Sequence, residues 1–178
     1  MDRDYRRAPP CIMAHIIMVQ PPAFEHKIVS PEDLGGRLRS LARPLVFTNG
    51  VFDVLHRGHV TYLAESRALG ASLILALNSD SSVKRLGKGE DRPVNPLEDR
   101  AAVAAALESV SLVTWFEEDT PLDLIRKCRP DVLVKGGDWP AEKIVGAKEV
   151  LGWGGEVRSI AFQFERSTTE LLSRIRKS

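Results

Sequence analysis

The stretch Pro44-Leu45-Val46-Phe47-Thr48-Asn49-Gly50-Val51-Phe52-Asp53-Val54-Leu55-His56-Arg57-Gly58-His59 decides how this chain is expected to fold. Its first residues are apolar, β-branched or aromatic, which predicts a short buried strand that ends at the turn Asn49-Gly50. The segment from Gly58 to Leu69 has helical spacing. His56 and His59 therefore lie where a strand passes into a helix, beside backbone amides that are free to bind an anion.

The rest of the chain continues this alternation of strand and helix. Further strands are predicted at 72–77, 110–116, 131–134 and 156–160. Helices are predicted between them, and a last helix from Thr168, whereas the charged, glycine-rich segment 81–94 is predicted to be a loop. Such alternation favours right-handed βαβ crossovers and one doubly wound, Rossmann-like parallel sheet with helices on both faces. Ligands of open sheets of this kind bind beyond the carboxyl ends of the strands.

Length and composition predict one compact domain. The chain has 178 residues, of which 43% are hydrophobic and 28% charged, as in ordinary globular proteins. Residues 1–26 mix arginines with a short apolar run, and they are predicted to form a disordered extension before a folded domain at 27–178. The apolar run is too short to span a bilayer.

Charge and cysteine content narrow the classes of partner and compartment. The formal net charge is +1, so no overall field attracts nucleic acid or an anionic membrane. Cys11 and Cys128 are far apart and have no metal-ligand spacing, so they are expected to be free thiols in a reducing cytoplasm.

The histidine turn remains the candidate phosphate site once other phosphate motifs are tested. Neither G-x-x-x-x-G-K-[ST] nor a G-x-G-x-x-G after the first strand occurs, which argues against a P-loop kinase and a dinucleotide oxidoreductase. Taken alone, the pair His56 and His59 also fits a helix cap or part of a zinc site.

The segment Gly50 to His59 matches the pattern G-x-F-D-x-x-H-x-G-H and thereby resembles the cytidylyltransferase-like nucleotidyltransferases. Within that family, the chain looks most like the branch that adenylylates a heptose 1-phosphate. The stretches that extend the resemblance follow in the expected order and are Asn78-Ser79-Asp80, Lys84-Arg85-Leu86, Arg92-Pro93-Val94-Asn95-Pro96-Leu97-Glu98, Glu117-Glu118-Asp119-Thr120-Pro121, Val134-Lys135-Gly136-Gly137-Asp138, Lys148-Glu149-Val150 and Ser167-Thr168-Thr169.

The resemblance implies an adenylyltransferase that transfers AMP from ATP to D-glycero-β-D-manno-heptose 1-phosphate. The products are ADP-heptose, for lipopolysaccharide core or related surface-sugar synthesis, and pyrophosphate. Such a transfer depends on positioning and on stabilising the charge of the phosphates rather than on a covalent intermediate.

The resemblance also implies roles for individual residues. The catalytic residues are expected to be His56, His59 and Lys84, with Lys88 competing for the role of Lys84. Asp53 is expected to fix its turn by accepting backbone N–H bonds, and Ser167 with Glu170 also fits a plain capping box. Residues expected to bind ATP are Thr48, Asn49, Gly50, Val51, Phe52, Asp53, Asn78, Lys135, Gly136, Asp138, Ser167, Thr168 and Thr169. Residues expected to bind the sugar phosphate are Asp80, Arg85, Arg92 and Arg100.

The expected cofactor is Mg²⁺, which accompanies ATP, although no dense carboxylate cluster marks its site. ATP and heptose 1-phosphate are the expected partners, with no nucleic acid and no membrane. A separate sugar kinase is expected in the same pathway, and a homodimer is compatible with the apolar strands and edge helices. Two other functions stay open, a transferase of the same fold such as a glycerol 3-phosphate cytidylyltransferase, and a nucleotide-binding domain without catalysis.

Overall fold

The computed structural model describes residues 20–87, 89, 91–161, 163–164, 168, 171 and 174–175. Five strands form a single sheet in which every described pairing is parallel, in the order β3-β2-β1-β4-β5. The predicted doubly wound sheet is therefore confirmed. The strands are β1 (Leu45–Gly50), β2 (Ser72–Asn78), β3 (Leu112–Phe116), β4 (Val132–Gly136) and β5 (Glu156–Ile160).

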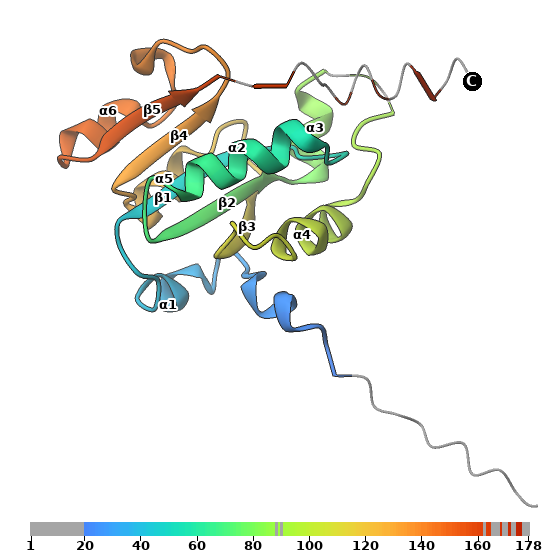
Figure 1. Cartoon of the computed structure of the whole chain (residues 1–178), viewed down its shortest axis with the longest axis horizontal. Coiled ribbons are helices and arrows are strands. Elements are labelled where there is room, and N and C mark those ends of the chain that lie inside the picture. The colour runs from blue at the N-terminus through green and yellow to red at the C-terminus, as the bar shows by residue number, and fades with distance from the viewer. Residues whose placement is uncertain are drawn as a thin grey trace, which may run out of the picture.

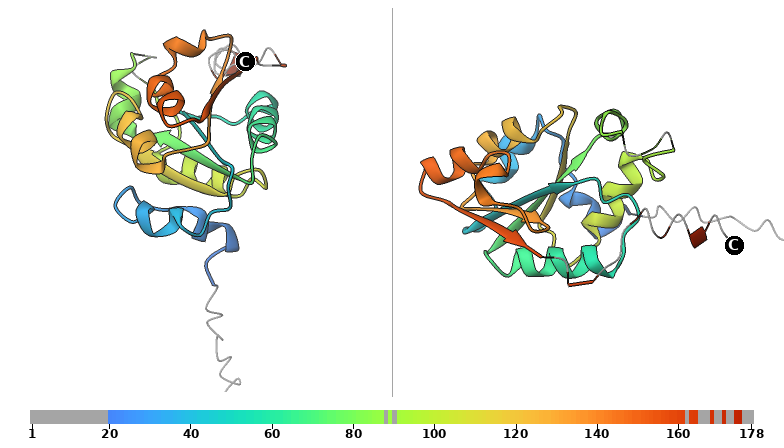
Figure 2. Two further views of the ribbon diagram at one scale, coloured as in Figure 1. Left: turned by 90° about the vertical axis from the view of Figure 1, so that its left-hand side faces the viewer. Right: turned by 90° about the horizontal axis from the view of Figure 1, so that it is seen from above.

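Helices cover both faces of the sheet (Figures 1 and 2). The described helices are η1 (Ala23–Lys27), α1 (Leu34–Leu38), α2 (Arg57–Arg67), α3 (Asp80–Arg85), α4 (Leu97–Ala105), α5 (Leu122–Cys128), η2 (Ala141–Lys143) and α6 (Ala147–Gly152). One core cluster lies under α2 and α4, and the other lies under α1, α5 and α6. Among these helices, none has the length and apolar character needed to cross a bilayer.

The strands read as continuous apolar runs because both faces of the sheet are covered. All seven residues of β2 are buried, as are the first four residues of β1. β1 pairs with β2 through six residue pairs, from Leu45 with Ser72 to Gly50 with Leu77. It pairs with β4 through only two, the last being Phe47 with Leu133. The strand order reverses at this β1–β4 pair, where ligands of such sheets bind.

The segment 81–94 is not a loop throughout, so that prediction is wrong. Its first residues belong to α3, whose N-cap Ser79 accepts a hydrogen bond from the Ser82 amide at 3.2 Å. Asp80 in the first turn and Lys84 with Arg85 in the last turn complement the helix dipole. Lys84 is therefore held on a helix.

Asn95 does not cap helix α4, although the pattern Asn95-Pro96-Leu97-Glu98 is typical of a capping box. The N-cap of α4 is Pro96, which makes no side-chain capping bond, and the Asn95 side chain donates instead to the Asp53 carbonyl.

Toward the N-terminus, helix η1 begins at Ala23, before the expected start of the domain at Lys27. Phe24 in η1 packs against the core, and Lys27 donates to the Leu107 carbonyl at 3.1 Å. The packed part of the chain thus includes residues before Lys27.

Candidate active site

The turn between β1 and α2 brings two imidazole rings into contact. His56 is the N-cap residue of α2 and has extended backbone angles, and the His59 amide donates to its carbonyl at 3.0 Å. The two rings stack with centroids 3.8 Å apart and planes at 22°. Phe52, whose backbone φ of 48° lies in the left-handed region, packs its ring 5.0 Å from His59. A non-glycine residue held at such an angle is typical of a functional turn.

Burial keeps His59 neutral in the free protein. Desolvation, assisted by the positive charge of the neighbouring His56, lowers the pKa of the ring from 6.5 to about 4. A hydrogen bond to the Val54 carbonyl partly opposes both effects. The negative charge of a phosphate beside the ring would raise this pKa again, so the turn is electrostatically suited to an anion.

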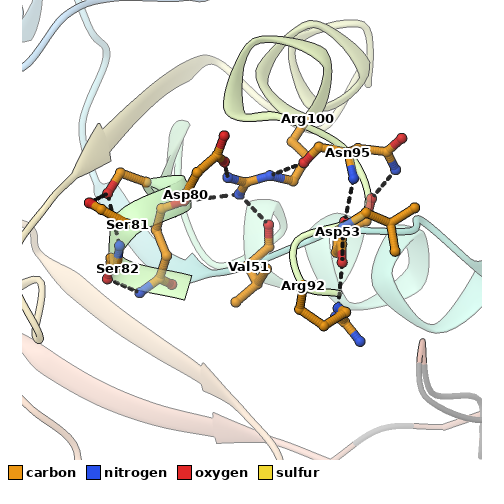
Figure 3. A network of polar contacts seen from close by, with 11 residues as sticks. Val51, Asp53, Asp80, Ser81, Ser82, Arg92, Asn95 and Arg100 are labelled. Atoms are coloured by element: carbon orange, nitrogen blue, oxygen red, sulfur yellow. Dashed lines mark hydrogen bonds and ion pairs between the residues drawn. The ribbon is translucent and has the colours of Figure 1, made fainter. Parts of the chain in front are cut away.

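Asp53 braces the histidine turn from inside the protein. Its side chain is fully buried and accepts hydrogen bonds from the amides of Val94 and Asn95, each at 2.9 Å, and forms an ion pair with Arg92 at 2.5 Å (Figure 3). Asp53 was expected to accept backbone N–H bonds, and it does so from the 94–95 segment. Arg92 was expected to bind the sugar phosphate. Their side chains contact each other and the 92–95 segment instead, because burial of either charge requires a partner.

Arg100 connects the carboxyl ends of two strands (Figure 3). Its guanidinium is fully buried and donates to the carbonyls of Val51 at 2.8 Å and Asn78 at 2.9 Å. It also donates to the Asn95 carbonyl at 3.0 Å and forms an ion pair with Asp80 at 2.6 Å. Arg100 and Asp80 were expected to bind the sugar phosphate. In the structure all three guanidinium nitrogens are bonded to the protein, which assigns Arg100 a bracing role.

Thr48 is held away from the crevice by a tyrosine of α2. Both residues are buried, and their hydroxyl oxygens lie 2.5 Å apart. The Tyr62 hydroxyl also bonds to the backbone of Gly136 at the end of β4, and burial raises the pKa of Tyr62 to about 12. The Thr48 side chain therefore fastens α2 to the β1–β4 junction, and the contact with ATP that was expected of its backbone amide stays a prediction.

Helix α3 carries two neighbouring basic residues, Lys84 and Arg85, whose side chains differ in their contacts. The Lys84 side chain is exposed and makes no hydrogen bond or ion pair with the described residues. Arg85 forms an ion pair with Asp119 at 2.7 Å and donates to the Glu117 carbonyl. The Asn78 side chain donates to the Ser82 hydroxyl at 3.0 Å, which ties the end of β2 to α3. Of these three residues, only Lys84 has a side chain without a hydrogen bond or ion pair to the described residues.

A cavity of about 360 Å³ opens at the carboxyl ends of β1 and β4. Asn49, Gly50 and Val51 at the end of the first strand lie in its wall, and so do Asn78 and Lys135. All five were expected to bind ATP, which stays a prediction. Asp138 is exposed at the following loop. The remaining lining residues are Leu86, Phe116, Asp119, Thr120, Pro121, Trp139, Lys143, Ile144 and Val145.

The described part of the C-terminal segment contacts the histidine turn. Thr168 is buried, and its hydroxyl lies 3.4 Å from the Val54 carbonyl. The Arg57 guanidinium lies 3.9 Å from the centre of the Phe164 ring. The predictions for Ser167 and Thr169 fall outside the described residues. Thr168 nevertheless brings this segment to the wall that carries the histidines.

Several residues of this region were missed by the sequence analysis, namely Tyr62, Asp119, Trp139 and Lys143. Helical spacing indicates only that Tyr62 faces the core, so its bond to Thr48 has no sequence signal. Trp139 follows the Gly136-Gly137-Asp138 turn, and a tryptophan beside a turn at a strand end is a signal that could have been used. Within the described residues, no group of three or more histidine, cysteine, aspartate or glutamate side chains is arranged to hold a metal ion.

Comparison with known proteins identifies relatives of the whole region. The family model described as cytidylyltransferase-like matches residues 47–174. A D-beta-D-heptose 1-phosphate adenylyltransferase from Bordetella bronchiseptica is 55% identical over 156 residues, which cover 86% of this chain and 96% of that protein. The bifunctional protein HldE from Hahella chejuensis is 53% identical over 139 residues, which cover 78% of this chain but 29% of HldE.

Solved structures show the same fold. A lipopolysaccharide core biosynthesis protein from Thermoplasma volcanium superposes with a TM-score of 0.55 at 27% identity, over 68% of this chain and 98% of that one. Pantothenate synthetase from Thermus thermophilus superposes with a TM-score of 0.52 at 18% identity, over 76% of this chain and 61% of that one. The second likeness concerns the fold alone.

Proposed function

The chain belongs to the cytidylyltransferase-like family, and on that premise we propose that it transfers AMP from ATP to D-glycero-β-D-manno-heptose 1-phosphate. The products are ADP-heptose and pyrophosphate, and ADP-heptose serves the lipopolysaccharide core or a related surface sugar. The identity of 55% to a heptose 1-phosphate adenylyltransferase over nearly that protein's whole length supports the choice of substrates.

The stacked pair His56 and His59 at the start of α2 is the observation that carries the proposal. The first amides of a helix have no partner within the helix and attract anions, and two imidazoles add N–H donors at the same place. Gly50 lies at the end of β1, where a Cβ would come within 2.8 Å of the Phe52 ring. A glycine there lets the Phe52 ring pack closely against the strand end.

We assign the transfer to positioning and charge stabilisation. An oxygen of the sugar phosphate attacks the α-phosphorus of ATP, the bond from that phosphorus to the bridging oxygen breaks, and pyrophosphate leaves with the electron pair. His56 and His59 hydrogen-bond the phosphate oxygens, on which negative charge increases in the transition state. Lys84 extends from α3 toward the attacking phosphate and the α-phosphate, and Asp138 accepts hydrogen bonds from the ribose hydroxyls.

Mg²⁺ is part of the proposal as a companion of ATP. The described residues form no dense carboxylate cage, which fits an ion that is bound through phosphate oxygens and keeps several waters. When bound, Mg²⁺ supplies positive charge to the triphosphate.

Cytoplasmic location belongs to the proposal because the reaction consumes ATP. A separate sugar kinase would supply the heptose 1-phosphate.

Pyrophosphate release tests the proposal. Purified full-length protein with Mg²⁺ is given ATP or CTP, each with heptose 1-phosphate or glycerol 3-phosphate, and the nucleotide sugar is identified by mass spectrometry. We expect release only from ATP with heptose 1-phosphate. Release from CTP with glycerol 3-phosphate alone would replace the function by that of a cytidylyltransferase, and nucleotide binding without release from any pair would leave a binding domain.

A further inference from the structure

The cavity at the β1–β4 junction is lined in part by exposed apolar side chains that do not belong to the histidine turn. Leu86, Trp139 and Val145 line it and expose 42%, 51% and 42% of their surfaces. They come from α3 and from the connection between β4 and α6, which are distant in sequence. Large apolar side chains that gather around a cavity are typical of a ligand site.

The cavity and the histidines lie on opposite sides of the end of β1. Phe116 and Ile144 in the cavity wall belong to the core cluster under α1, α5 and α6. The histidines begin α2, which covers the other face of the sheet. No residue of the segment 52–60 is among those that line the cavity. The end of β1, Asn49 to Val51, therefore separates two binding regions.

The separation of the cavity from the histidines bears on where the acceptor binds, and this inference rests on the proposed function. In phosphoryl transfer the attacking and leaving oxygens lie roughly in line on opposite sides of the phosphorus. If the histidine side holds the phosphates that leave, the acceptor must approach from the opposite side of the end of β1. The cavity lies on that side. Its volume is at the low end of the range of about 300–1,000 Å³ for ligand pockets, so it suits one substrate rather than both.

We propose that this cavity binds the acceptor sugar phosphate and that Lys143 and Trp139 select it. Lys143 is exposed at the rim and forms no ion pair with the described residues, so its ammonium group is available to the anionic acceptor. Trp139 offers an indole face to the sugar ring. Asp119, which the ion pair with Arg85 holds in place, and the amides of Asn49 and Asn78 provide partners for sugar hydroxyls.

The proposal relocates acceptor recognition within the site. The residues expected to bind the sugar phosphate were Asp80, Arg85, Arg92 and Arg100, yet their side chains form ion pairs within the protein. Lys143 and Trp139 lie on the connection after β4. Differences in this connection would thus alter acceptor choice while the histidine wall stays the same.

Steady-state kinetics of Lys143→Ala and Trp139→Ala test the assignment. The matched control is Lys148→Ala, because Lys148 is exposed on α6 and does not line the cavity. We expect each cavity variant to raise the KM for heptose 1-phosphate at least about tenfold, the size of one lost charge-assisted contact, with the KM for ATP within about twofold. The control should match the unsubstituted protein, and circular dichroism should show that all variants are folded.

The outcomes separate this proposal from the proposed function. A selective rise in the KM for ATP would assign the cavity to the nucleotide, and unchanged constants would show that it binds neither substrate. If the unsubstituted protein uses another acceptor from a panel of sugar and alcohol phosphates, the proposed function fails. The cavity assignment is then tested with that acceptor, whose KM should rise in both variants while that of ATP does not.

Discussion

Two groups of cations lie near the carboxyl edge of the sheet, and they differ in what they contact. Arg92 and Arg100 are buried and bonded to Asp53, Asp80 and backbone carbonyls. Lys84 and Lys143 are exposed and form no ion pair with the described part of the chain. All four are basic residues near the carboxyl edge of the sheet, so residue type alone does not distinguish their roles. The structure indicates that the arginines shape the crevice and that the lysines are available to a substrate.

The chemistry of the two side chains explains the division. A guanidinium has five donors in a fixed planar arrangement, which lets Arg100 bond to Val51, Asn78 and Asp80 at once. A lysine ammonium is strongly hydrated and is costly to bury without complete pairing. Arginine therefore suits an internal brace, and an exposed lysine suits a contact that forms only when substrate arrives.

The largest expected effect is on stability, from Arg100→Ala. The substitution leaves the carbonyl oxygens of Val51, Asn78 and Asn95 without this donor and Asp80 without its partner. We expect the free energy of unfolding to fall by about 3–5 kcal/mol, as when one partner of a buried charged network is removed. Urea denaturation followed by circular dichroism measures it.

The matched control for Arg100→Ala is Lys84→Ala. The Lys84 side chain is exposed and makes no hydrogen bond or ion pair with the described residues. The free energy of unfolding should therefore change by less than about 0.5 kcal/mol. Its kcat/KM should nevertheless fall, since the lysine is proposed to contact the reacting phosphates. A stable Arg100→Ala variant beside an unstable Lys84→Ala variant would reverse the comparison.

The next largest effect concerns catalysis by the histidine turn. His59→Ala removes the proposed donor to the phosphates, and loss of one comparable donor in another enzyme costs about 3–4 kcal/mol of transition-state stabilisation. We expect kcat/KM to fall by about two to three orders of magnitude in the pyrophosphate assay. The free energy of unfolding should change far less than in Arg100→Ala. Near-native turnover would remove His59 from the mechanism.

The sequence predicted the framework better than the contacts within the site. All five strands were expected within a few residues, because continuous apolar runs and turn residues mark buried parallel strands. The roles of Arg92, Arg100 and Asp80 depend on bonds between residues up to 49 positions apart, which local patterns do not report. Helix α3 is different, since its Ser79 cap and charged ends were legible in the sequence and were outweighed by the glycines that follow.

The pH dependence of stability tests the burial of the histidine pair. His59 has a pKa of about 4 in the folded protein and about 6.5 when unfolded, so the unfolded state binds more protons between these values. Stability is therefore expected to fall as pH drops from 6.5 toward 4. For this one group the loss between pH 7 and pH 5 is at most about 2 kcal/mol, and less if solvent reaches the ring.

The substitution His59→Gln isolates this contribution from those of the carboxylates. Urea denaturation of both proteins at pH 7 and pH 5 should show a smaller loss of stability on acidification in the variant. Equal losses in the two proteins would mean that the His59 ring is solvated in the folded protein. The histidine pair would then be no less hydrated than the exposed Lys84 and Lys143.

The smallest expected effect comes from Tyr62→Phe, which tests whether hydrogen bonds of an uncharged side chain also maintain the shape of the site. The Tyr62 hydroxyl bonds to Thr48 on β1 and to Gly136 on β4, beyond the last of the two residue pairs that join these strands. Losing it should cost about 1 kcal/mol of stability, the net value of a typical hydrogen bond. The control Ser111→Ala removes a hydrogen bond to the Leu73 amide at the amino edge of the sheet and should cost a similar amount. Tyr62, unlike Ser111, spans the β1–β4 junction, so of these two variants only Tyr62→Phe should also raise the KM for ATP. Equal kinetics in the two variants would show that the sheet alone holds the crevice open.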